Sequence, residues 1–142
     1  MKNLLGGFAG ALALNLLHET YKRIDSKAPR IDLVGEEALS KIIERTGNVP
    51  PKGDRLYTAT LAGDIVSNTF YYALIGYGNK ESIITRGTLL GLAAGVGALT
   101  LTKPLGLSNS PVTRTKRTKA LTVAWYIAGG VVAALTIRAL DK

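Results

Sequence analysis

The sequence contains no cysteine and only one histidine, His18. The absence of cysteine excludes disulfide bonds, thiolate metal sites and a cysteine nucleophile. A single histidine excludes a histidine cluster within one subunit. The chain also has only five prolines against sixteen glycines. Because glycine lets helix backbones approach closely in lipid, this balance favours close helix packing over disorder.

Four long apolar stretches fill most of the 142 residues, at 4–21, 56–77, 83–101 and 120–137. At a rise of about 1.5 Å per residue, each covers roughly the 30 Å core of a bilayer. The sequence therefore predicts an all-α polytopic membrane protein, with four transmembrane helices in a tight bundle that forms a single membrane domain over 1–142. A signal peptide is the alternative for the first stretch, which the three further spans disfavour.

Lysine and arginine are spread unequally among the connections between these spans. The connection 18–55 holds eight and the connection 102–119 holds five, which makes thirteen of the eighteen in the chain. Basic residues concentrate in cytoplasmic loops. We therefore expect a multi-pass protein of the bacterial inner (plasma) membrane, with both of these connections in the cytoplasm and both termini non-cytoplasmic.

The first long connection contains an amphipathic helix predicted over 32–46. Asp32 is expected to cap its start, with Glu36 and Glu37 favoured at the positive end of the helix dipole. One apolar stripe contains Val34, Ala38, Leu39, Ile42 and Ile43. Gly47 is expected to end the helix. We expect this helix to dock on the cytoplasmic ends of the spans as a lid or brace, with binding to a separate partner as the alternative.

Asp64 is the only acidic residue in the second span. An ionisable group inside the membrane costs about 2.5 to 3.5 kcal/mol, so it normally has a partner or a function. Helical rise places Asp64 at nearly the same depth as polar residues at the end of the first span. The predicted intramembrane polar cluster contains Asn15, His18, Glu19, Thr60, Asp64, Asn68 and a hydroxyl from Tyr71 or Tyr72.

Small residues predict how the helices pack. A glycine zipper in the third span and matching glycines in the first and fourth spans favour close helix contacts. These residues are Gly87, Gly91 and Gly95, Gly6 and Gly10, and Gly129 and Gly130. Segment 4–14 also matches segment 89–99 at seven of eleven positions, which indicates either a duplicated helical hairpin or a coincidence of composition.

The second long connection has four bases and no acid over 113–119. These bases are Arg114, Lys116, Arg117 and Lys119. They either anchor the fourth span on the cytoplasmic side or bind anionic lipid headgroups. Nucleic-acid binding is not expected, because no recognisable nucleic-acid module accompanies the net charge of +8.

Three function classes are compatible with this pattern. The first is proton- or ion-linked transport or channel activity in a homo-oligomer, joined through the glycine faces, with Asp64 as the titrating or coordinating group and His18 and Glu19 as a relay. The second is a non-catalytic membrane scaffold or accessory subunit. The third is a metal-dependent membrane enzyme using the same three side chains. The sequence identifies no catalytic residue, metal set or cofactor, and favours the non-enzymatic classes.

Overall fold

The computed structural model describes residues 1–141, which form helices connected by turns, with no strand among them. The α-helices are α1 (Lys2–Ile24), α2 (Ile31–Arg45), α3 (Asp54–Ala73), α4 (Ile83–Thr100), α5 (Ser110–Thr113) and α6 (Lys116–Ala139). Two short 3-10 helices, η1 (Leu74–Gly76) and η2 (Lys80–Ser82), join α3 to α4. The prediction of an all-α helical bundle is confirmed.

Local chemistry accounts for several of the helix ends. The side chain of Thr115 accepts a hydrogen bond from the Thr118 amide, so α6 begins earlier than the predicted fourth span. Gly47 and Gly53 both have positive φ, at 79° and 58°, on either side of the irregular segment between α2 and α3. The second span was predicted to reach residue 77, but its α-helix ends at Ala73 and continues only as η1.

Two helical stretches are long and apolar enough to cross a membrane, namely Lys80–Thr100 and Lys116–Ala139. The helices α1 and α3 are long enough but less apolar than α4 and α6. The polar residues of the predicted cluster lie on these two less apolar helices. Length and composition therefore allow a membrane span at two of the four expected places, and four spans stay a prediction.

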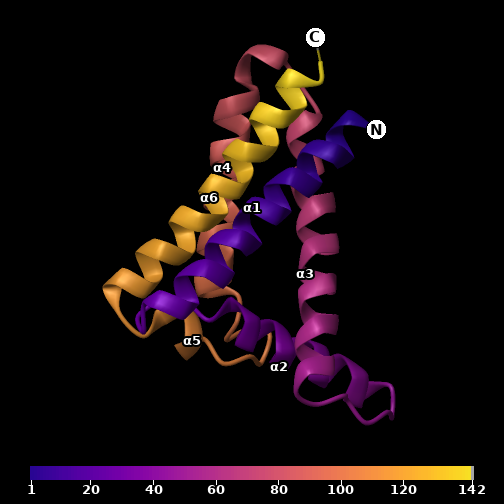
Figure 1. Ribbon diagram of the computed structural model, residues 1–142, viewed down its shortest axis with the longest axis vertical. Coiled ribbons are helices and arrows are strands. Elements are labelled where there is room, and N and C mark those ends of the chain that lie inside the picture. Colours follow the sequence, from indigo (N-terminus) through magenta and orange to yellow (C-terminus); the bar gives the residue numbers. More distant parts are fainter. Residues whose placement is uncertain (142) are drawn as a thin grey trace.

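The helices form a wedge rather than a parallel bundle (Figure 1). Both termini lie at one end, and α2 and α5 lie at the other. The two basic connections are therefore at the same end of the molecule. Helix α3 approaches α1 near the termini and diverges from it towards α2 (Figure 1). The closest approach brings Gly7 of α1 against the backbone carbonyl of Thr69.

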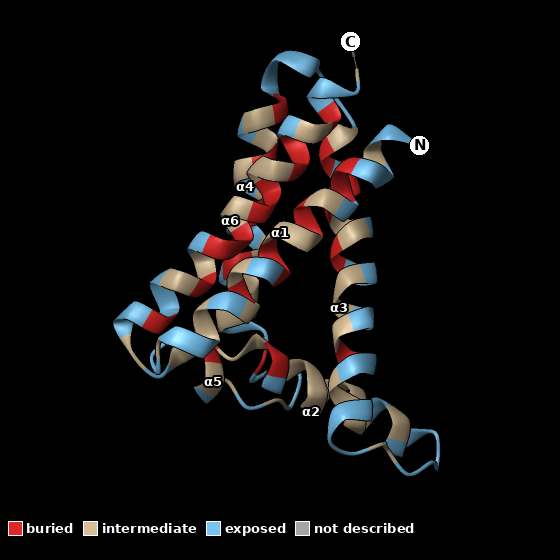
Figure 2. Ribbon diagram, viewed as in Figure 1, coloured by how far each residue is buried: buried red, intermediate tan, exposed pale blue. Residues whose placement is uncertain are grey.

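Helix α6 packs between α1 and α4, and buried residues line the faces where these three helices meet (Figure 2). From α1, Gly10 lies against the backbone of Gly129, and from α4, Gly87 lies against the backbone of Gly130. Gly91 continues this contact one turn further along α4. The glycine faces are thus occupied within one chain. They do not provide the surface for a homo-oligomer that the sequence prediction assigned to them.

The two segments matched as a repeat pack differently. Gly95 of α4 faces Val123 on α6, the second helix of its own hairpin. Gly10, its counterpart in α1, meets the ring of Tyr72 on α3, the second helix of its own hairpin, and also the backbone of Gly129 on α6. Gly10 therefore differs from Gly95 by an added contact with the other hairpin, and the repeat stays a prediction with both of its interpretations.

Candidate functional site

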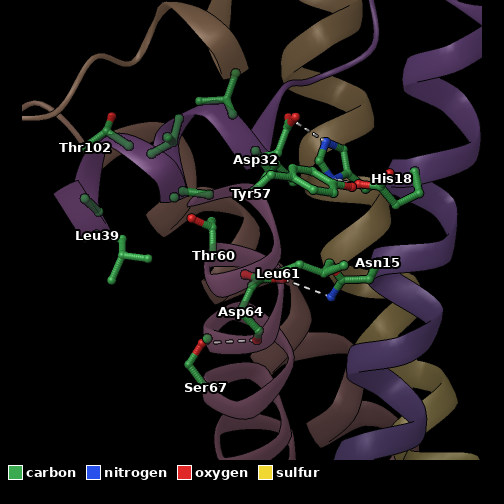
Figure 3. A pocket seen from close by; sticks show the side chains of 18 of the residues that line it. Asn15, His18, Asp32, Leu39, Tyr57, Thr60, Leu61, Asp64, Ser67 and Thr102 are labelled. Atoms are coloured by element: carbon green, nitrogen blue, oxygen red, sulfur yellow. Dashed lines mark hydrogen bonds and ion pairs between the residues drawn. The ribbon is translucent and has the colours of Figure 1, made fainter. Parts of the chain in front are cut away.

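A cavity of about 400 Å³ lies where α1 and α3 diverge, closed on one side by α2 (Figure 3). This volume is within the range of small-molecule sites. The polar part of its wall comes mainly from α1 and α3 and contains Asn15, His18, Glu19, Tyr57, Thr60 and Asp64. The part from α2 is mostly apolar and contains Ile31, Val34, Ala38, Leu39 and Ile42. The cavity is therefore amphipathic.

Asp64 is held by two amide groups. The side-chain nitrogen of Asn15 donates to Oδ2 and that of Asn68 donates to Oδ1, both at 2.9 Å. No ion pair within residues 1–141 includes Asp64. Amide donors satisfy part of the hydrogen-bonding capacity of a carboxylate without cancelling its charge. The cavity wall thus contains one carboxylate that has no basic partner.

A second polar group joins α1 to the start of α2. The guanidinium of Arg30 donates to both carboxylate oxygens of Asp32, at 2.9 Å from Nε and 2.8 Å from Nη2. Nε2 of His18 lies 3.2 Å from Oδ1 of Asp32, a close polar contact that lacks the alignment of a hydrogen bond. Burial alone would raise the pKa of Asp32, but His18 and Arg30 hold it well below its usual range.

The prediction that Asp32 caps α2 is wrong. Arg30 is the N-cap residue and no side chain caps the helix. The carboxylate of Asp32 instead points to α1 and is almost completely buried. Its position in the first turn still suits the helix dipole. Its main contacts, however, hold α2 against α1.

Lys22 extends this group to α3. Its ammonium donates to Glu19 at 2.7 Å and to the Tyr57 hydroxyl at 3.1 Å, and it lies 3.4 Å from Asp32. The sequence prediction missed Asp32, Lys22 and Tyr57 as site residues. The i, i+4 spacing of His18 and Lys22 places both side chains on one face of α1, but the acid that follows the helix end directly is Asp25, so no local signal selects Asp32 as their partner.

The structure divides the predicted polar cluster into two groups. Asn15, Asp64 and Asn68 form one, and His18 and Glu19 belong to the other, next to Asp32. Thr60 lies one turn before Asp64 on α3, and its buried hydroxyl has no hydrogen-bond partner within the described residues.

The prediction that a tyrosine hydroxyl joins the cluster is wrong. The Tyr71 hydroxyl donates to the carbonyl of Leu90 and the Tyr72 hydroxyl donates to the carbonyl of Tyr126, each at 2.8 Å. Near these residues α1 and α3 are in close contact through glycine, so the rings extend past α1 to α4 and α6. They attach α3 to the rest of the bundle.

The four bases of the second connection do not act as one patch. Arg114 donates to the backbone carbonyls of Ser26 and Ala28, both at 3.0 Å, and Arg117 pairs with Asp25 at 2.8 Å. These two arginines hold the turn between α1 and α2. Lys116 and Lys119 are exposed, and headgroup binding by this segment stays a prediction.

The metal-dependent class would need His18, Glu19 and Asp64 around one ion. Within residues 1–141, no group of three or more histidine or acidic side chains is arranged to hold a metal. His18 instead lies between Glu19, at 3.8 Å from Nδ1, and Asp32. The scan of protein-family models, the search of curated proteins and the search of solved structures each found no match to this chain.

Proposed function

We propose that this chain is a four-span protein of the bacterial inner membrane that transports or conducts protons or other cations through the cavity, with Asp64 as the binding group. One observation carries the proposal: a carboxylate in the polar part of an amphipathic cavity is held by two asparagine amides and has no basic partner. A carboxylate in such a site gains free energy by binding a proton or a cation.

The position of the cavity supports a route from the end that contains α2. His18 and Asp32 lie on the side of the cavity nearest that end, and Asp64 lies deeper (Figure 3). Beyond Asn68 the route is closed, because Tyr72 packs against Gly10 and Gly129. Transport across this barrier requires α3 to move relative to α1 and α6.

The proposed topology is testable because the chain has no cysteine of its own. Asn48 and Asn79 are exposed at opposite ends of the molecule, between α2 and α3 and before α4. In intact spheroplasts, Asn79→Cys is expected to react with a membrane-impermeant maleimide, whereas Asn48→Cys is expected to react only after permeabilisation. The reverse pattern would contradict the orientation. Reaction of both in intact spheroplasts would contradict the membrane assignment.

Asp64→Asn is expected to reduce cation flux in proteoliposomes to the level of empty vesicles while the protein stays folded. The loss of one hydrogen bond, about 1 kcal/mol, is offset by the removal of a buried charge, so the melting temperature should hold or rise. Flux of protons, Na⁺ and K⁺ and thermal melting are measured on the same purified protein.

Asp54→Asn is the matched control, since Asp54 is exposed at the start of α3 and outside the cavity. This change should leave flux unaltered. Undiminished flux in Asp64→Asn would remove Asp64 from the transport site. Absence of flux in the wild-type protein would favour the scaffold, in which the Asn15–Asp64–Asn68 hydrogen bonds serve only to join α1 and α3.

A further inference from the structure

The cavity has unpartnered polar groups on its wall. Within the described residues, five buried side-chain atoms have no hydrogen-bond partner. Two of them are the hydroxyls of Thr60 and Thr102, residues that line this cavity, whereas Nε2 of His18 already faces the carboxylate of Asp32 at 3.2 Å. The two threonines are only 8% and 6% exposed. Because buried polar groups are nearly always hydrogen-bonded, two unpartnered hydroxyls at one cavity favour a bound molecule that supplies the missing partners.

The apolar part of the wall limits what this molecule can be. Helix α2 presents Val34, Leu39 and Ile42 to the cavity, and α3 adds Leu61. A water molecule occupies about 30 Å³, so the space greatly exceeds the needs of one or two waters. A bare ion would leave the α2 side of the cavity without contacts. The occupant therefore has an apolar body as well as a polar group.

The charges of the wall determine the sign of the occupant. Three carboxylates line the cavity, from Glu19, Asp32 and Asp64, and His18 is the only basic residue among the lining side chains. Glu19 is paired with Lys22 and Asp32 with Arg30, so only the carboxylate of Asp64 lacks a basic partner. An anion placed here would meet this charge at close range. A cation would complement it.

The available acceptors select a cation that can donate hydrogen bonds. Each Asp64 oxygen accepts one asparagine hydrogen bond and keeps capacity for another. The unpartnered hydroxyl of Thr60 lies on the same face of α3, one turn away. An ammonium group has up to three donors and can bond to both residues at once.

We propose that the cavity binds an amphipathic organic cation, a protonated alkylamine or arylalkylamine, with its ammonium group on Asp64 and Thr60 and its apolar body against α2. The proposal rests on the assignment of Asp64 as the cation-binding group in the proposed function. It extends that function by naming the class of ligand that fills the cavity.

Three probes of equal chain length separate charge from hydrophobicity: octylammonium, octanol and octanoate. Trp125, the only tryptophan, lies behind the cavity wall with its ring centre 6.0 Å from that of the lining residue His18, so its fluorescence is an indirect readout of occupancy. Octylammonium is expected to bind saturably to the purified protein, about tenfold or more tightly than octanol. One charge-assisted hydrogen bond supplies enough binding free energy for a difference of this size. Octanoate is expected not to bind. Asp64→Asn should abolish the preference for octylammonium over octanol.

A steric variant tests the location. Gly63 lines the cavity, and a Cβ built there meets no atom within 4 Å. Gly63→Leu should therefore fold normally and fill the space, so that octylammonium and octanol both lose binding. Ala62→Leu is the control, because Ala62 is the exposed neighbour outside the cavity. This change should leave binding unaltered.

The proposal would be overturned if octylammonium bound no more tightly than octanol, or if Asp64→Asn kept the preference. Unaltered binding in Gly63→Leu would overturn the location. The protein could also show a flux of protons, Na⁺ or K⁺ that depends on Asp64 without preferring octylammonium. That result would contradict only the proposal of an organic ligand. The proposed function would then stand.

Discussion

Gly91→Leu is expected to prevent assembly of the bundle, whereas Leu92→Ala is expected to leave it folded. A Cβ at Gly91 would lie 2.6 Å from both the carbonyl oxygen of Tyr126 and Cα of Ile127. These are backbone atoms of α6, which cannot move aside as a flexible side chain can. Overpacking a core typically costs about 1 to 3 kcal/mol, and a leucine against backbone should exceed that range. Thermal melting and monodispersity in detergent measure the effect.

Two controls accompany this variant. Leu92 is 40% exposed, so its truncation should change stability by only about 0.5 kcal/mol. Gly97→Leu makes the same glycine replacement on the same helix, where the nearest atom is a leucine side-chain carbon at 3.5 Å. This variant should fold. If Gly91→Leu and Gly97→Leu melted alike, the contact between α4 and α6 would not depend on the glycine face.

Asp32→Ala is expected to release α2 from the bundle. The change leaves Arg30, His18 and Lys22 without the carboxylate that they share. Breaking a buried ion pair costs about 3 to 5 kcal/mol, and the lower end applies here because the side chain of Arg30 is 39% exposed. Hydrogen exchange of the α2 amides should accelerate accordingly, while exchange in α4 and α6 should change little.

Glu36→Ala is the matched control for this variant. Glu36 lies one turn after Asp32 and makes no ion pair within residues 1–141. Its replacement tests the helix-dipole contribution alone, which is about 0.3 to 1 kcal/mol. Equally fast exchange of α2 in both variants would contradict the role assigned to Asp32.

The pH dependence of α2 docking follows from the same carboxylate. The pKa of Asp32 is lowered in the folded state, so its contribution is fully present above the pKa of the unfolded chain, about 3.9, and is lost as the pH falls through the folded value. After correction for intrinsic exchange rates, protection of α2 should therefore not weaken through titration of Asp32 between neutral pH and about pH 5.

Much of the local structure follows from the sequence alone. The amphipathic stripe and Gly47 predict a helix over 32–46, and α2 spans Ile31–Arg45. The spacing of apolar and small residues likewise predicts four long helices and an all-α fold. These features depend on residues a few positions apart, which helical geometry brings together regardless of the rest of the chain.

The helical rise per residue predicted that Asn15 and Asp64 lie at the same depth in the membrane. It did not predict which polar groups contact each other at that depth. Asn15 does reach Asp64, whereas His18 turns to Asp32, a residue expected to cap a helix. Tyr72 lies one turn beyond Asn68, yet its hydroxyl reaches α6. Such choices depend on how far each helix is rotated and how closely its neighbour approaches.

The sequence by itself determined the helices, their approximate ends and the polar residues available to a site. Only the tertiary structure decided that the glycine faces are used within one chain, that α3 diverges from α1, and that α2 closes the space between them. The physical reason is that a cavity arises from the separation of whole helices. That separation depends on contacts between residues far apart in the chain, such as Gly7 with Thr69 and His18 with Asp32.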